Sequence, residues 1–241
     1  MMQTSVAAPS GQLSTRDAIG GQRPAARAPS ALFAAHLIQM MFDRRSLLVS
    51  PLALAAPLSA WAQAPAPAGV EVAGVRFVQT ETVGNARLQL NGAGIRYKAI
   101  FKVYAAGLYL GAKATTPEAV YAAPGPKRLH VVMLREIDGN ELGKLFTDGM
   151  RKNATREEFG KSIPGTLKLA EMFVTRKRLA SGDSFTVDYI PGTGTVISLN
   201  GKVATEPIVE PVFFIAMMKI WLGADPPDWQ LKDALLGQSK S

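Results

Sequence analysis

The chain has 241 residues, a formal net charge of +8, two histidines and no cysteine. The lack of cysteine excludes disulfides, thiolate catalysis and cysteine-ligated zinc. His130 is the only histidine beyond the first 64 residues, which excludes a multi-histidine metal site there and leaves little scope for a Ser-His-Asp triad. We therefore expect no metal and no cofactor.

Residues 41–64 have the pattern of an export signal. They begin with charge, pass into an apolar stretch, and offer a small-x-small cleavage site at Ala62-Gln63-Ala64. The stretch is too short, and too often interrupted by proline, to span a membrane. The paired Arg44-Arg45 fits a twin-arginine signal, and an ordinary Sec signal remains the alternative. We expect an exported, periplasmic protein.

Residues 1–40 lie upstream of that signal and are rich in Ala, Ser, Gly and Arg. They predict either a disordered extension or a start codon that is really at Met40 or Met41. Residues 65–69 are a Pro/Ala spacer, which should be extended and solvated. Residues 70–238 then provide enough chain for one domain.

The charge of the remaining chain is milder than the total. Five arginines and two aspartates precede residue 65, so the rest carries 22 basic and 17 acidic residues. The dense basic cluster Arg176-Lys177-Arg178 has no interleaved aromatic residues. We therefore expect no nucleic-acid partner and interpret the cluster as charge at a helix end.

Runs of β-branched and aromatic residues predict strands. The predicted strands are residues 75–80, 86–90, 95–104, 107–110, 127–134, 184–190 and 195–199. Caps and helical periodicity predict helices between and after them. The predicted helices are a short one after Thr116, one from Asp138 through Met150, and residues 166–179, 207–222 and 225–235.

The order of these elements indicates an α+β domain, in which a curved antiparallel sheet carries helices on one face. The helix at 207–222 is hydrophobic all round, so it should be buried against the sheet. Glu157-Glu158 is interpreted as part of an exposed face.

The segment with the most chemical information is Gly92-Ala93-Gly94-Ile95-Arg96. Closely spaced glycines suit a turn, or a place where another group approaches the backbone. A guanidinium entering a sheet is costly to bury unless it meets a carboxylate, a phosphate or a polarised carbonyl. The motif lacks the third glycine and the following helix of a dinucleotide site.

This segment, followed by Lys102-Val103-Tyr104 and the apolar run to Leu110, resembles the opening hairpin of the chalcone isomerase-like family in its exported bacterial branch. The resemblance covers about residues 70–236. It implies an open-faced β-sandwich whose cleft lies between the sheet and the helices.

In the plant isomerases of that family, the motif's arginine faces the cleft and polarises an enone, and Arg96 matches it. Tyr104 stands where the family has a threonine. By the same resemblance, Leu142, Gly149 and Met218 replace a tyrosine, an asparagine and another polar residue. The loss of these hydroxyl and amide groups argues against chalcone cyclisation.

A second line of the family binds fatty acids without turnover, through the arginine and a tyrosine. By this resemblance Arg96 and Tyr104 are the ligand-binding residues. Four apolar residues could line an acyl tunnel or could equally be core: Phe146, Met150, Phe213 and Met217. We expect an exported protein that binds a fatty acid or an aromatic acid. The alternatives are an isomerase acting on an unsaturated carbonyl compound and a partner-binding envelope protein without a small ligand.

Two questions about Arg96 stay open at this point. It could instead form a structural salt bridge with Glu81 or Glu136. If residues 96–104 were one unbroken strand, Arg96 and Tyr104 would lie roughly 27 Å apart. They could then share a ligand only if the chain turned near residues 96–98.

Overall fold

The computed structural model of the protein describes residues 68–238. The predicted extension (1–40), the export signal (41–64) and most of the spacer (65–69) lie outside the described residues. In the described range, no helix is long and apolar enough to cross a membrane.

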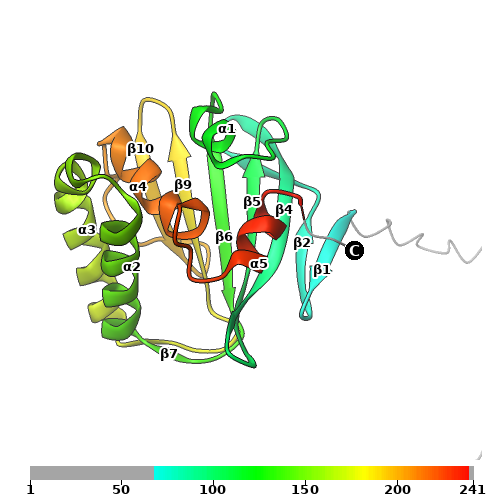
Figure 1. Cartoon of the computed structure of the whole chain (residues 1–241), viewed down its shortest axis with the longest axis horizontal. Helices are drawn as coiled ribbons and strands as arrows, with labels where there is room; N and C mark the ends of the chain where they lie inside the picture. The colour runs from blue at the N-terminus through cyan, green and yellow to red at the C-terminus, as the bar shows by residue number, and fades with distance from the viewer. Residues whose placement is uncertain (1–67, 239–241) are drawn as a thin grey trace, which may run out of the picture. The chain divides into compact units, whose positions relative to one another are not determined.

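A seven-stranded sheet forms the centre of the domain, and all its neighbouring strands are antiparallel (Figure 1). In spatial order the strands are β11 (Lys202–Val203), β10 (Gly194–Leu199), β9 (Ser184–Ile190), β6 (Lys127–Met133), β5 (Phe101–Leu110), β4 (Ala86–Lys98) and β3 (Thr80–Val83). Two small two-stranded antiparallel sheets accompany it. One pairs β1 (Gly69–Val72) with β2 (Val75–Val78), and the other pairs β7 (Ile137–Asp138) with β8 (Arg178–Leu179).

The helices pack on one face of this sheet (Figure 1). They are α1 (Pro117–Ala122), α2 (Gly139–Asn153), α3 (Arg156–Arg176), α4 (Pro211–Leu222) and α5 (Trp229–Leu235). The main core joins aromatic residues of the helices to inward-facing strand residues such as Val131 and Val187. On the other face, Phe77 of β2 packs with Leu88 and Tyr109. The predicted α+β class, with helices on one face of an antiparallel sheet, is confirmed.

The β4–β5 hairpin differs from the prediction. The chain does not break at Gly92 or Gly94, because β4 runs through both. A Cβ atom at Gly92 would lie 2.0 Å from the carbonyl oxygen of Ala234, and one at Gly94 would lie 2.5 Å from the Ala234 Cβ. The glycines therefore allow α5 to approach β4, which is the second of the two roles considered for them. The turn lies at Ala99 and Ile100, where Ala99 has a φ of +54°.

The predicted helix at 166–179 has different limits. It is α3, which begins ten residues earlier, at Arg156, and ends at Arg176. Its interior contains Pro164, which interrupts the helical pattern in the sequence although the helix continues through it. The helix ends because Lys177 adopts a φ of +65°, and Leu179 belongs to β8.

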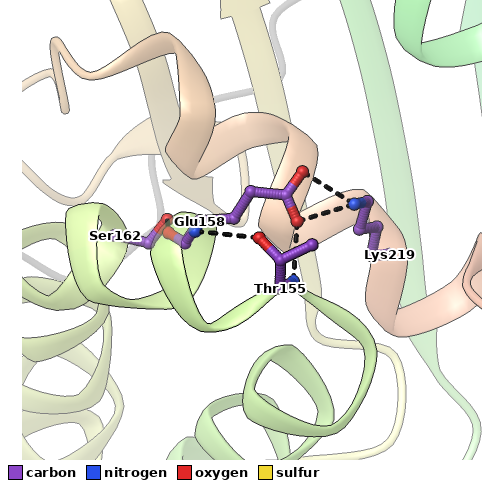
Figure 2. Close-up of polar contacts among 4 residues, drawn as sticks. All are labelled: Thr155, Glu158, Ser162 and Lys219. Carbon is purple, nitrogen blue, oxygen red and sulfur yellow. Dashed lines mark hydrogen bonds and ion pairs between the residues drawn. The ribbon is translucent and has the colours of Figure 1, made fainter.

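At the start of α3, the structure corrects the prediction that Glu157 and Glu158 are both part of an exposed face (Figure 2). Glu158 accepts a hydrogen bond from the Thr155 N–H at 2.8 Å, and the Thr155 hydroxyl accepts one from the Glu158 N–H at 3.2 Å. Both carboxylate oxygens of Glu158 also lie 2.7 Å from the ammonium of Lys219 on α4. Glu157 is exposed as expected, whereas Glu158 caps α3 and connects it to α4.

Candidate ligand-binding site

A cavity of about 620 Å³ opens between the β4–β5 hairpin, α2 and the segment that precedes α5. Arg96 and Tyr104 both line it. The other lining residues are Lys98, Phe101, Val103, Arg135, Glu136, Ile137, Glu141, Leu142, Leu145, Phe146, Asp148, Gly149, Lys152, Asn153, Ile220, Asp225, Pro226 and Pro227. The volume is within the range of small-molecule pockets.

Arg96 and Tyr104 face each other across the hairpin. The turn at residues 99–100 folds the chain back, so Arg96 on β4 pairs directly with Tyr104 on β5. Directly opposed residues of an antiparallel pair have Cβ atoms about 5 Å apart. The register shifts beside this pair, because Tyr97 pairs with Lys102 and leaves Val103 as the extra residue. Such bulges re-aim side chains next to functional sites.

The two carboxylates considered as structural partners of Arg96 are bound elsewhere. Glu81 accepts from Arg128 at 2.8 Å, and Glu136 lies 3.5 Å from Arg178. Within residues 68–238, Arg96 forms no ion pair. Arg96 is half-buried and lines the cavity without pairing with any carboxylate of the described chain.

The other charges of the cavity wall are largely balanced. Each of its four carboxylates has a cationic partner, in the pairs Glu136–Arg178, Glu141–Lys98, Asp148–Arg151 and Asp225–Lys152. The two lysines of the lining, Lys98 and Lys152, are therefore already in ion pairs. Among the described residues, Arg96 and Arg135 remain without a carboxylate, and Arg135 stacks over the Phe101 ring at 4.5 Å. The two guanidinium groups are thus the cations of the lining that form no ion pair within residues 68–238.

Tyr104 is held by Trp221 of α4. The Trp221 indole N–H donates to the Tyr104 hydroxyl oxygen at 2.8 Å. Burial raises the pKa of Tyr104 to about 12, although the Trp221 hydrogen bond and the nearby Arg96 oppose that increase. The phenol is therefore neutral at physiological pH, and its proton can be donated to a ligand. The sequence reasoning missed Trp221, although an indole N–H on a wholly apolar helix needs an acceptor.

The rest of the wall is apolar. Leu142, Phe146 and Ile220 are buried within it. Phe101 and Leu145 are 51% and 50% exposed, so apolar side chains also border the solvent. Of the four residues considered for an acyl tunnel, only Phe146 lines the cavity. The other three are core residues with no exposed surface: Met150, Phe213 and Met217.

Leu142 and Gly149, which the resemblance aligned with a tyrosine and an asparagine of the isomerases, both line the cavity. Met218, aligned with the third polar position, is buried and does not line it. The cavity therefore presents an aliphatic side chain and a glycine at two positions where the resemblance implied polar side chains.

A comparison with family models shows to which protein family this chain belongs. The model described as chalcone isomerase-like matches residues 69–237. This protein belongs to the chalcone isomerase-like family. Among solved structures, this chalcone isomerase-like protein is similar to an Arabidopsis thaliana fatty-acid binding protein. The TM-score is 0.51 at 12% identity, with 68% of this chain and 92% of that chain covered. At this identity the likeness shows the fold alone. A search of curated proteins gave no match.

Proposed function

We propose that this protein binds a fatty acid or another amphipathic carboxylate in the 620 Å³ cavity. The carboxylate lies against Arg96 and Tyr104, and the apolar part of the ligand lies along Leu142, Phe146 and Ile220. The observation that carries this proposal is the guanidinium of Arg96, which faces an apolar cavity without an ion pair in the described chain and lies opposite a neutral phenol.

The two polar groups complement each other chemically. A guanidinium offers a planar fork of donors that matches the two oxygens of a carboxylate. The hydroxyl of Tyr104 already accepts from Trp221, which leaves its own proton to donate. Partial burial strengthens both hydrogen bonds relative to water. The likeness in fold to a fatty-acid binding protein supports this choice of ligand class.

Binding without turnover fits the cavity better than ring closure does. Chalcone cyclisation needs groups that hold and polarise an aromatic enone. At two of the cavity positions where the resemblance implied polar side chains, Leu142 and Gly149 provide neither a side-chain hydroxyl nor a side-chain amide. A protein-binding role without a small ligand is disfavoured because the cavity is open and is not filled by the protein's own side chains.

Export also remains part of the proposal and rests on residues 41–64. Intact-mass measurement of the protein from cells should give a mature N-terminus between residues 63 and 70. A mature chain that retains residues 41–64 would contradict export by this signal.

Native mass spectrometry tests the proposed ligand. Protein purified under mild conditions should carry acyl chains, and delipidated protein should rebind hexadecanoic acid at one equivalent. Turnover of a chalcone panel without acyl binding would instead support the isomerase. If neither occurred, a role in binding a protein partner would be favoured.

A further inference from the structure

A second cavity, of about 240 Å³, lies at the other end of β6. It is bordered by α1, the loop at residues 123–125, the end of β9 and the first turn of α4. Lys127 begins β6, whereas Met133, which pairs with Tyr104, ends it. Six residues of strand separate the two positions by about 20 Å. Figure 1 shows α1 and β7, which flank the two cavities, at opposite ends of the sheet.

Lys127 lines this cavity although the residue is only 4% exposed. Its ammonium lies 5.0 Å from the centre of the Tyr189 ring and 5.9 Å from that of Phe214. The cavity wall contains no aspartate or glutamate, and within residues 68–238 Lys127 has no ion pair. Burial lowers its pKa, with no carboxylate acting in the opposite direction. A buried ammonium without a counter-ion is costly, and two aromatic faces offset only part of that cost.

Two other features of this cavity bear on the binding of an anion. The hydroxyl of Tyr121 is buried and, among the described residues, has no hydrogen-bond partner. The first turn of α4 contributes Pro211 and Phe214 to the wall, and the N-cap residue Glu210 makes no side-chain capping bond. The N-terminus of α4, with its positive dipole, therefore borders this cavity.

We propose that this cavity is a second binding site, specific for a small monocarboxylate with a short apolar or aromatic tail. The Lys127 ammonium pairs with the carboxylate, the Tyr121 hydroxyl donates to it, and Tyr189 and Phe214 contact the tail. One ammonium balances one negative charge. The apolar wall, which includes three prolines (Pro124, Pro191 and Pro211), disfavours a doubly charged phosphate.

Thermal unfolding of the full chain in propionate, benzoate or inorganic phosphate, at constant ionic strength, tests the site. The carboxylates should raise the melting temperature saturably. Lys127→Met should weaken their binding at least about tenfold, because the charge-assisted bond is lost. Tyr121→Phe should weaken it less. The exposed control Lys102→Met, which lines neither cavity, should bind as the wild type does. Stabilisation by phosphate alone, or the same stabilisation in Lys127→Met, would overturn the proposal.

Two further measurements keep the test decisive if a variant folds poorly. Without any ligand, Lys127→Met should melt at a higher temperature than the wild type, because it removes an uncompensated buried charge. In the wild type, amide chemical-shift changes caused by propionate should centre on Tyr121, Lys127 and Phe214. Changes centred on Arg96 and Tyr104, or no saturable change, would assign the binding to the larger cavity or to no site.

Discussion

Arg96 and Arg128 are both arginines of the sheet, yet their surroundings differ. Arg128 donates to Asp188 at 2.7 Å and to Glu81 at 2.8 Å. Its hydrogen bonds to Asp188, together with the charge of Asp188 and Glu81, raise the pKa of Arg128 despite burial. Arg96 has no such partner in the described chain and faces the larger cavity. Arg128 therefore stabilises the sheet, whereas Arg96 is available to a ligand.

Arg96→Met should therefore abolish most fatty-acid binding and leave the free energy of unfolding nearly unchanged. Arg96→Lys should bind with intermediate affinity, because an ammonium cannot form the two parallel bonds of a guanidinium. The matched control Arg128→Met should lose roughly 2–4 kcal/mol of stability, since it leaves partly buried carboxylates unpaired. Urea denaturation and fatty-acid titration measure the two effects. A stability loss in Arg96→Met as large as that of Arg128→Met would show that Arg96 is structural.

Tyr104 should contribute to both stability and binding. Tyr104→Phe removes the acceptor of the Trp221 N–H and the donor to the ligand. We expect a loss of about 1–3 kcal/mol in unfolding free energy and weaker fatty-acid binding. Tyr97→Phe is the control, because no hydrogen bond of the Tyr97 hydroxyl occurs within residues 68–238. Unchanged stability and affinity in Tyr104→Phe would remove this residue from the site.

One carboxylate, that of Glu158, forms an ion pair between α3 and α4. Burial would raise the pKa of Glu158, but hydrogen bonds from Lys219 and from the Thr155 N–H outweigh it and hold the pKa below its usual value. A depressed pKa contributes stability above about pH 4.5, the ordinary value for the unfolded chain, and that stability disappears as the pH falls through the folded value.

Glu158→Gln should therefore reduce the unfolding free energy at pH 7 by roughly 1–3 kcal/mol. The difference from the wild type should shrink below pH 4. Its neighbour Glu157 provides the control: Glu157 pairs with Lys161 on an exposed face, so Glu157→Gln should unfold at the same urea concentration as the wild type. Equal effects of the two substitutions would contradict a special role for Glu158.

The sequence predicted the type of most elements, because apolar periodicity and caps are local signals. It misplaced the β4–β5 turn, since Gly92 and Gly94 are required by Ala234, which is about 140 positions later in the chain. It also placed the start of α3 too late, because Pro164 hides the periodicity of the first turns. The family resemblance predicted Arg96 and Tyr104 as binding residues, and both line the cavity. Trp221 and Arg135 come from separate segments, and only the tertiary structure brings Trp221 to the Tyr104 hydroxyl and Arg135 to the cavity wall.

For the molecule as a whole, buried phenols should govern stability at high pH. Burial is the main cause of the raised pKa values of Tyr104, Tyr109 and Tyr121, and that of Tyr104 is about 12. Tyrosines of the unfolded chain ionise near pH 10. Their contribution to stability is therefore complete below pH 10 and is lost as the pH rises toward the folded values.

Unfolding free energy should thus decrease steeply above pH 10, and the decrease should be smaller in Tyr104→Phe. Urea denaturation at several pH values, with tyrosinate absorbance of the native protein, checks this. Native tyrosines that all titrate near pH 10 would contradict the burial of these phenols.

The central claim concerns the whole protein with its ligand: Arg96 binds the carboxylate of a fatty acid. The most direct test is a thermodynamic cycle in which wild type and Arg96→Met are each titrated with hexadecanoic acid and with hexadecanol. We predict that the substitution weakens binding of the acid by about tenfold or more and leaves binding of the alcohol unchanged. An equal effect on both ligands, or no effect on the acid, would contradict the claim.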